Sequence, residues 1–456
     1  MTTSPVQTLQ YTPVASMIPE MVYPPVPGET HAFYGDHHNK GVKLPDRSHL
    51  KFNDSNLPNP LNSEIPNQIQ KEINERLYIA AETGDANVMS ELLEAMDAAT
   101  NGSPSGLINT PSPSTGLTAL HYAASRGHLT LVQLLVDSGS IVELPDKEGE
   151  TALLKAAYNG YLSVIKYLVE HQADVNHKDN DGWTALHNAC SRGQLDVVRW
   201  LIEISGADVN IRSKMGHTPL INAASKGYLH IVRYLLRKGK ANPLIKNKFG
   251  EAAYDVAAVS MEAQVCELLE RAEKDWWRAH RKPSAGGPPV VKEKYDMIAS
   301  HNTILVILHE NQRSTSSFRL RFTAPKFSIS ALSKSDIRGP WSLTNGEPKD
   351  KEDIHLPTPP ESSQSTSDSW FWLTDWQVDI KHLQVDPEEG WQYSRSFDCL
   401  EKEWTPSAPG AGSGGSWVRR RRWFRAMKRQ VDVAQLTLDE SDDNISFNSQ
   451  EAISSS

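Results

Sequence analysis

The chain has 456 residues and carries 56 acidic against 47 basic side chains, a formal net charge of −9. The length allows two or three domains, and the acidic balance argues against a dedicated nucleic-acid-binding protein. Three scattered cysteines favour a reducing compartment over a disulfide framework. The apolar runs are short and the N-terminus lacks the regions of a signal peptide, so no transmembrane segment is expected.

Both ends of the chain have compositions that are typical of disorder. Residues 1–70 are rich in Pro, Asn and Ser with little hydrophobic periodicity, and residues 431–456 are acidic and Ser-rich. Such segments bury too little apolar surface to offset the entropy of ordering, so both are predicted to be disordered. The His37-His38 pair lies in the first of them without neighbouring Cys or spaced carboxylates, and no metal site is expected there.

The middle of the chain repeats itself. Glycines recur every 33 or 34 residues, and four of them precede a variant of T-x-L-x-x-A, a small-residue turn and a second apolar helix. The recurring glycines are Gly116, Gly149, Gly182, Gly216 and Gly250. This pattern resembles the ankyrin repeat over about 73–272, with four clear repeats at 116–249 between degenerate caps. The resemblance implies an all-α-type solenoid of helix-turn-helix units joined by hairpins.

Two histidines of the T-A-L-H motif, His121 and His187, are the residues that a metal site would use. In ankyrin units this histidine bonds the hairpin backbone, and the other two repeats have Leu154 and Ile221 in its place. We therefore expect a structural role for both. The chain carries no nucleophile, phosphate-loop or metal motif, which predicts a protein that is not an enzyme and has no catalytic residue, metal or cofactor.

Hairpin tips and inner helices of such an array line a concave groove, because each repeat contributes the same positions. Here these positions hold two aromatic residues and a column of cations, the composition of a protein-binding hot spot. The sequence predicts that an acidic or extended peptide binds there. The residues expected to bind it are Arg126, Tyr158, Trp183, Arg192 and Lys226.

A linker is predicted at 273–294, between the repeats and a region of different character. It contains Trp276 and Trp277, which are expected to dock the two parts together or to cap the array. Eight of the twelve tryptophans lie beyond it, from Trp341 to Trp423. Period-two alternation predicts strands over 370–380 and 417–425, with Trp and Arg sharing one face of the second.

Five separated motifs of this region resemble the peroxin/dysferlin (DysF) domain, over roughly 295–430. In order they are ENQR (310–313), DIRGPWS (336–342), WQVD (376–379), EEGWQYSRSF (388–397) and WVRRRRWFR (417–425). The resemblance implies an all-β domain held by stacked Arg and Trp side chains. Its members are mostly associated with peroxisomal, endoplasmic-reticulum, plasma or endolysosomal membranes. A Pro/Ser-rich insertion at 347–369 departs from the pattern and is predicted to loop out disordered.

The same resemblance implies the members of the Arg/Trp stack, which are Trp341, Trp376, Trp391, Arg419, Arg421 and Trp423. Side chains on the other face or beyond the strand are candidates for anionic headgroups, and two further tryptophans are candidates for a membrane interface. These candidates are Trp370, Trp372, Arg420, Arg422, Lys428 and Arg429. Core packing of the two tryptophans stays an alternative. Thr358, followed by two prolines, is a candidate phosphorylation site.

Taken together, these patterns predict a cytoplasmic adaptor without a transmembrane segment, peripheral on an organelle membrane. The ankyrin groove binds a protein partner, and the DysF domain attaches to a peroxisomal, endoplasmic-reticulum or endolysosomal membrane or to a membrane complex. One alternative is a soluble protein scaffold that touches no lipid. Another is a nuclear regulator that uses the run Arg419–Arg422, although no nucleic-acid partner is expected.

Overall fold

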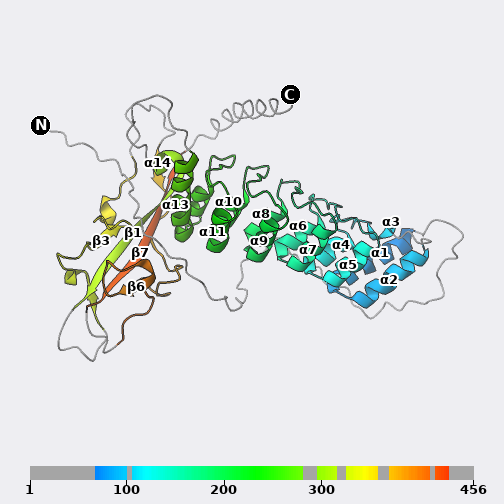
Figure 1. Ribbon diagram of the computed structural model, residues 1–456, viewed down its shortest axis with the longest axis horizontal. Helices are drawn as coiled ribbons and strands as arrows, with labels where there is room; N and C mark the ends of the chain where they lie inside the picture. The colour runs from blue at the N-terminus through cyan, green and yellow to red at the C-terminus, as the bar shows by residue number, and fades with distance from the viewer. Residues whose placement is uncertain are drawn as a thin grey trace, which may run out of the picture.

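The computed structural model describes residues 67–99, 105–280, 295–315, 325–357, 369–410 and 416–430. The predictions for residues 1–66 and 431–456 lie outside the described residues, as do most of the expected linker and Thr358. A helical array, drawn from blue to green in Figure 1, leads into a β-module at its C-terminal end.

Helix pairs stacked side by side form the array. The pairs begin with α1 (Asn67–Thr83) and α2 (Ala86–Ala99), followed by the single turn α3 (Ser105–Ile108). Then come α4 (Ala119–Arg126) with α5 (Leu129–Asp137), α6 (Ala152–Asn159) with α7 (Leu162–Glu170), α8 (Ala185–Arg192) with α9 (Leu195–Glu203), α10 (Pro219–Ser225) with α11 (Leu229–Arg237), and α12 (Ala253–Val259) with α13 (Ala263–His280).

Small side chains let the inner helices approach closely. Ala119, Ala123 and Ala124 of α4 are fully buried, and α4, α6, α8, α10 and α12 carry the same small-residue pattern. Each inner helix begins after a residue in extended conformation, which is Thr in four cases and Ala252 at α12. Gly127 ends α4 at φ +76°, and a Cβ there would meet the ring of Tyr161 at 2.4 Å.

Two long antiparallel strands form the centre of the β-module. Strand β1 (Thr303–Ser314) pairs with β7 (Val418–Arg429) over their whole length, from Thr303 opposite Lys428 to Arg313 opposite Val418. Short strands flank the pair: β2 (Phe327–Ser328) and β3 (Trp341–Leu343) lie along β1, and β4 (Trp370–Trp372), β5 (Gln377–Val378) and β6 (Trp391–Ser394) lie along β7. The module also has the helical turn α14 (Met297–Ser300) and the 3-10 turns η2 (Ile329–Ala331), η3 (Lys351–Asp353) and η5 (Glu401–Glu403).

Three expected boundaries differ from the structure. Residues 67–70, expected to be disordered, begin α1, and residues 273–280 of the expected linker continue α13, where Glu273 and Trp277 contact Tyr295 of the β-module. The first half of the expected disordered insertion, 347–357, folds onto the sheet: Ile354 is buried and η3 covers two tryptophan rings. The polar composition of this segment gives no indication of these contacts.

The array and the β-module share one hydrophobic core. Leu269 of α13 belongs to the same buried cluster as Ile304 of β1 and Phe424 of β7. Figure 1 shows the end of the sheet lying against α13, with α14 beside the same helix. The two parts therefore form a continuous packed body rather than domains that swing about a linker.

Candidate functional site

In two repeats the fourth residue of the inner-helix motif, a histidine, bonds to the next hairpin. In α4, His121 Nδ1 accepts from the Thr118 N–H at 3.1 Å, and Nε2 donates to the carbonyl of Glu150 in the following hairpin at 3.0 Å. His187 makes the same pair of contacts, with the His217 carbonyl at 3.0 Å. Burial lowers the pKa of His187 to about 4, in keeping with a neutral ring. The prediction that these histidines bond the hairpin backbone is confirmed.

In the last repeat this position is Asp255, which reverses the chemistry. Its side chain accepts from the backbone N–H groups of Asn302 at 2.6 Å and Thr303 at 2.9 Å, where β1 begins. It also accepts from its own cap residue Ala252 at 2.8 Å. The start of β1 thus occupies the place that the next hairpin would take, and offers donors where a hairpin offers a carbonyl.

His301 completes this buried contact between the array and the β-module. Its Nδ1 lies 3.0 Å from an oxygen of Asp255, and its Nε2 lies 2.8 Å from an oxygen of Glu273 on α13. Burial lowers the pKa of this histidine, but the two carboxylates outweigh it and raise the pKa to about 9. At neutral pH the ring is therefore an imidazolium that donates to both carboxylates.

Further ion pairs cross the same junction. Arg422 on β7 donates to Glu267 of α13 at 2.9 Å, and Lys428 lies 3.2 Å from Glu251, next to the last hairpin. Lys381 pairs with Glu262 at 2.7 Å. The sequence patterns did not predict these contacts. The one available signal was Asp255 itself, an acid at a position where two repeats have histidine.

The structure places the five predicted groove residues on or beside the inner helices. Arg192 lies over the ring of Tyr158 at 4.5 Å, so adjacent repeats are joined by a cation–π contact. Trp183 is half-buried, 6.0 Å from the ring of His187. Arg126 pairs with Glu82 at 2.8 Å, and Lys226 is exposed.

The residues predicted for the Arg/Trp stack lie around a buried carboxylate. Glu310 on β1 accepts from Arg421 Nε at 2.6 Å and from Trp423 Nε1 at 3.0 Å. Trp391 is buried, and the guanidinium groups of Arg419 and Arg421 lie 3.9 and 4.6 Å from the centroid of its ring. The charge of Glu310 holds the Arg421 side chain in place against the rings, and Gln312 accepts from Arg419.

A lysine that the sequence patterns did not single out closes the other side of this cluster. The Nζ atom of Lys351 lies 3.1 Å from the ring centroid of Trp423, 4.6 Å from that of Trp341 and 5.8 Å from that of Trp376. Burial lowers the pKa of Lys351. The residue was missed because it lies in the segment expected to loop out.

Two of the predicted headgroup candidates do not reach the surface. Arg420 and Arg422 are each 3% exposed, since β7 turns them toward the packed face. Arg420 pairs with Glu401 and lies over the ring of Trp404 at 4.1 Å, and Arg422 pairs with Glu267. The expectation that these two guanidinium groups are free is wrong, because leaving buried cations unpaired would cost several kcal/mol.

The other headgroup candidates gather near the array. Trp372 lies under Arg425 at 4.1 Å and Trp370 under Arg429 at 5.0 Å, and both rings are half-buried against the shared core. Lys428 and Arg429 are partly exposed at the end of β7, where Arg429 also donates to the carbonyl of Ile298.

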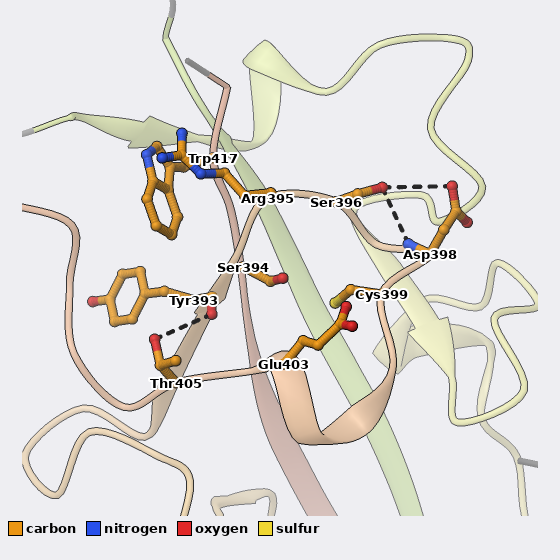
Figure 2. Close-up of a pocket in the computed structure, with 9 residues that line it drawn as sticks. All are labelled: Tyr393, Ser394, Arg395, Ser396, Asp398, Cys399, Glu403, Thr405 and Trp417. Atoms are coloured by element: carbon orange, nitrogen blue, oxygen red, sulfur yellow. Dashed lines mark hydrogen bonds between the residues drawn. The ribbon is translucent and has the colours of Figure 1, made fainter. Parts of the chain in front are cut away.

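An open cavity of about 550 Å³ lies near the other end of the sheet. Figure 2 shows Arg395 and Trp417 side by side at one wall, with the guanidinium carbon 3.9 Å from the ring centroid. Ser394, Cys399 and Glu403 point into the space between strand and turn. Burial raises the pKa of the Cys399 thiol, so it stays protonated and is a poor nucleophile at neutral pH. The other lining residues are Tyr393, Ser396, Asp398 and Thr405.

Within the described ranges, His, Cys, Asp and Glu side chains form no group arranged to hold a metal ion. The helices of those same ranges lack the length and hydropathy needed to cross a bilayer.

Comparison with known proteins agrees with the geometry of the array. Residues 61–146 and 139–213 match the family described as ankyrin repeats (3 copies), and residues 204–257 match ankyrin repeats (many copies). The helical part of this chain is an ankyrin-repeat array. The matched residues end ahead of the β-module.

A curated relative is the FYVE zinc finger domain protein UPA1 of Mycosarcoma maydis, 37% identical over 297 residues. The alignment covers 40% of this chain and 23% of the relative, so the chain spans less than a quarter of that protein's length. Ankyrin repeats are protein-binding modules and point to a non-enzymatic adaptor.

Proposed function

We propose that this protein is a non-enzymatic adaptor that holds a protein partner at an intracellular membrane. The ankyrin array binds the partner, and the β-module, which we assign as a DysF domain at 295–430, attaches to the membrane or to a membrane complex. The observation that carries the proposal is the junction at Asp255, His301 and Glu273. This junction fixes the array and the β-module in one orientation. A partner bound to the array is therefore held at a fixed position relative to the membrane or complex that the β-module contacts.

The side chains of the concave face are suited to binding an anionic, extended partner. Tyr158 and Arg192 already form a cation–π pair at 4.5 Å, so the side chains are held in place before a partner arrives and little further entropy is lost on binding. Trp183 adds a half-buried indole. Because Arg126 is paired with Glu82, the basic character of this face comes mainly from Arg192 and Lys226.

Co-purification of partners with the full chain tests this half of the proposal. The double substitution Trp183→Ala and Arg192→Ala should abolish capture of a partner that the wild-type protein retains. Lys166→Ala, on the exposed side of an outer helix, serves as the matched control and should leave capture unchanged. An identical set of partners for wild type and double variant would refute the groove assignment.

The membrane half rests on the DysF resemblance and on the side chains at the array end of the β-module. Trp370, Trp372, Lys428 and Arg429 are the candidates that retain exposed surface. The relative from Mycosarcoma maydis, named for a FYVE zinc finger, is a weaker support for membrane association. Flotation of the full chain with vesicles of different lipid classes tests it, and peroxisomal, endoplasmic-reticulum or endolysosomal membranes are the candidate locations.

Absence of flotation on every vesicle would favour a scaffold that contacts only proteins. The nuclear alternative is disfavoured by the fold, because an import receptor binds an extended basic peptide. Arg420 and Arg422 are instead buried in a paired strand. The location of a fluorescent fusion separates the membrane proposal from the nuclear alternative. A punctate or reticular signal supports the membrane proposal, and a nuclear signal contradicts it.

A further inference from the structure

Basic side chains are concentrated in the last repeats of the array. Between Arg199 and Lys248 the chain has ten Lys and Arg but only two acidic residues, Glu203 and Asp208, whereas the whole chain has a net charge of −9. Most of these cations are exposed. Such a local excess on an acidic protein marks a surface for an anionic partner.

Backbone hydrogen bonds hold the hairpin tips of the array in register. Each tip donates one N–H to the carbonyl of the tip before it, at 2.9 to 3.0 Å in the last three steps. The donors and acceptors are Asn180 to Glu148, Lys214 to Asp181, and Lys248 to Met215. The tips therefore form a connected row, which follows one edge of the array in Figure 1.

A second ladder runs through the bases of the same hairpins and reaches the β-module. Lys178 donates to the carbonyl of Arg212 at 3.1 Å, and Arg212 donates to that of Lys246 at 3.1 Å. Lys246 in turn donates to Ser300 of α14 at 2.9 Å. These exposed cations are fixed one per repeat, so the basic surface is continuous up to the β-module.

Side chains at the outermost position of the row change character along the array. Glu148 and Asp181 occupy it in the earlier hairpins, but Met215 and Phe249 occupy it in the last two, where they are 45% and 46% exposed. Each apolar side chain follows an exposed lysine, Lys214 or Lys248. Exposed apolar side chains flanked by lysine are favoured at a membrane interface, where the lysine reaches the headgroups.

We propose that the tips of the last two hairpins insert Met215 and Phe249 into the interface of an anionic membrane, with the surrounding cations on the headgroups. A membrane fits better than an acidic peptide because both apolar side chains protrude from turns. Protruding side chains can insert into the deformable surface of a bilayer, whereas a peptide side chain is usually bound in a cleft. The inference rests on the proposed function and adds the array to its membrane contact. Lys428 lies 3.2 Å from Glu251, two residues after Phe249, so the tips neighbour the candidates on β7.

Flotation of the full chain with phosphatidylcholine vesicles, with and without phosphatidylserine, tests the inference. Neutralising two cations in Lys214→Gln with Lys248→Gln should weaken partition onto the anionic vesicles about 30-fold. Replacing the apolar tips in Met215→Ser with Phe249→Ser should weaken it about tenfold, and this loss should persist at high salt. Ile204→Ser and Lys166→Gln are matched controls outside the row and should float as the wild-type protein does; Ile204 is 69% exposed.

The outcomes separate the inference from the proposed function. Wild-type flotation that both tip variants retain in full overturns the inference and leaves the membrane half of the proposed function standing. A wild-type chain that floats on no vesicle overturns the inference and the direct lipid contact of the proposed function, and leaves attachment to a membrane complex. If the tip variants float normally but lose a co-purified partner, the row is a protein-docking surface and the membrane inference is overturned.

Discussion

The Nδ1 atom of His301 lies 3.0 Å from a carboxylate oxygen of Asp255, and both side chains are buried at the join of array and β-module. The same carboxylate receives two backbone N–H groups of β1. One aspartate in the last repeat thus ends the ankyrin stack and binds the first residues of the sheet.

Removing this aspartate should loosen the junction before the rest of the molecule. In Asp255→Ala the imidazolium of His301 keeps one carboxylate, and the N–H groups of Asn302 and Thr303 lose their acceptor, at a cost of about 3–5 kcal/mol. We expect faster hydrogen exchange at the start of β1 and in the second half of α13. Asp375→Asn, on an exposed side chain, is the control; equal exchange in both variants would contradict the assignment.

Stability of the junction should fall as the pH rises. The folded pKa of His301 is about 9, above the ordinary histidine value of 6.5, so protonation stabilises the fold. This stabilisation is complete below pH 6.5 and is lost as the pH rises through about 9, by roughly 3 kcal/mol at most. Hydrogen exchange of β1 across this range measures it, and His301→Gln should remove the pH dependence.

The stability of the ankyrin array should depend on pH in the opposite direction. The pKa of His187 is lowered from 6.5 to about 4 and that of His121 is lowered too, so the unfolded chain binds more protons below pH 6.5. Stability of the repeats is then lost as the pH falls from 6.5 toward 4, by roughly 3 kcal/mol for His187. Exchange of α8 amides reports it. A flat profile in this range would show that the ring is not neutral in the fold.

Glu310 should be the most sensitive polar residue of the β-module. Glu310→Gln removes the charge that Arg421 and Trp423 share, and leaves a guanidinium without its carboxylate. Loss of about 3 kcal/mol is expected in the free energy of unfolding. Glu388→Gln, an exposed change of the same type, should cost less than about 0.5 kcal/mol. Denaturant titration of the two variants checks the difference.

Lys351 offers a test of the cation–π contacts separately from packing. Lys351→Met keeps the length of the side chain but removes the ammonium that lies 3.1 Å from the ring centroid of Trp423. The free energy of unfolding should fall by about 1 kcal/mol. Lys351→Arg should retain most of the stability. If Met and Arg variants unfold alike, the charge contributes nothing beyond its apolar stem.

Local patterns predicted the repeats well, but at the junction they indicated only the docking role of Trp276 and Trp277, of which Trp277 lies 6.2 Å from the ring of Tyr295. The glycine spacing located the hairpins, and the T-A-L-H motif indicated the bond from His121 to the next repeat, because these features depend on neighbouring units. Alternation along β7 was also readable, but which face would be buried depended on Glu401 and Glu267, distant in the chain. Asp255 and His301 are separated by 46 residues, and Lys351 lies in a polar stretch, so neither role is visible in a short window of sequence.

The replacement of histidine by Asp255 also limits how the gene for this protein can change in length. An internal repeat whose inner helix carries a hairpin-bonding histidine can be duplicated, since each copy meets a carbonyl of the next. A duplicated last repeat would instead point a carboxylate at a carbonyl oxygen, which repels it. Growth or loss of units is therefore tolerated inside the stack, and the distance between the first repeat and the sheet changes only in whole repeats.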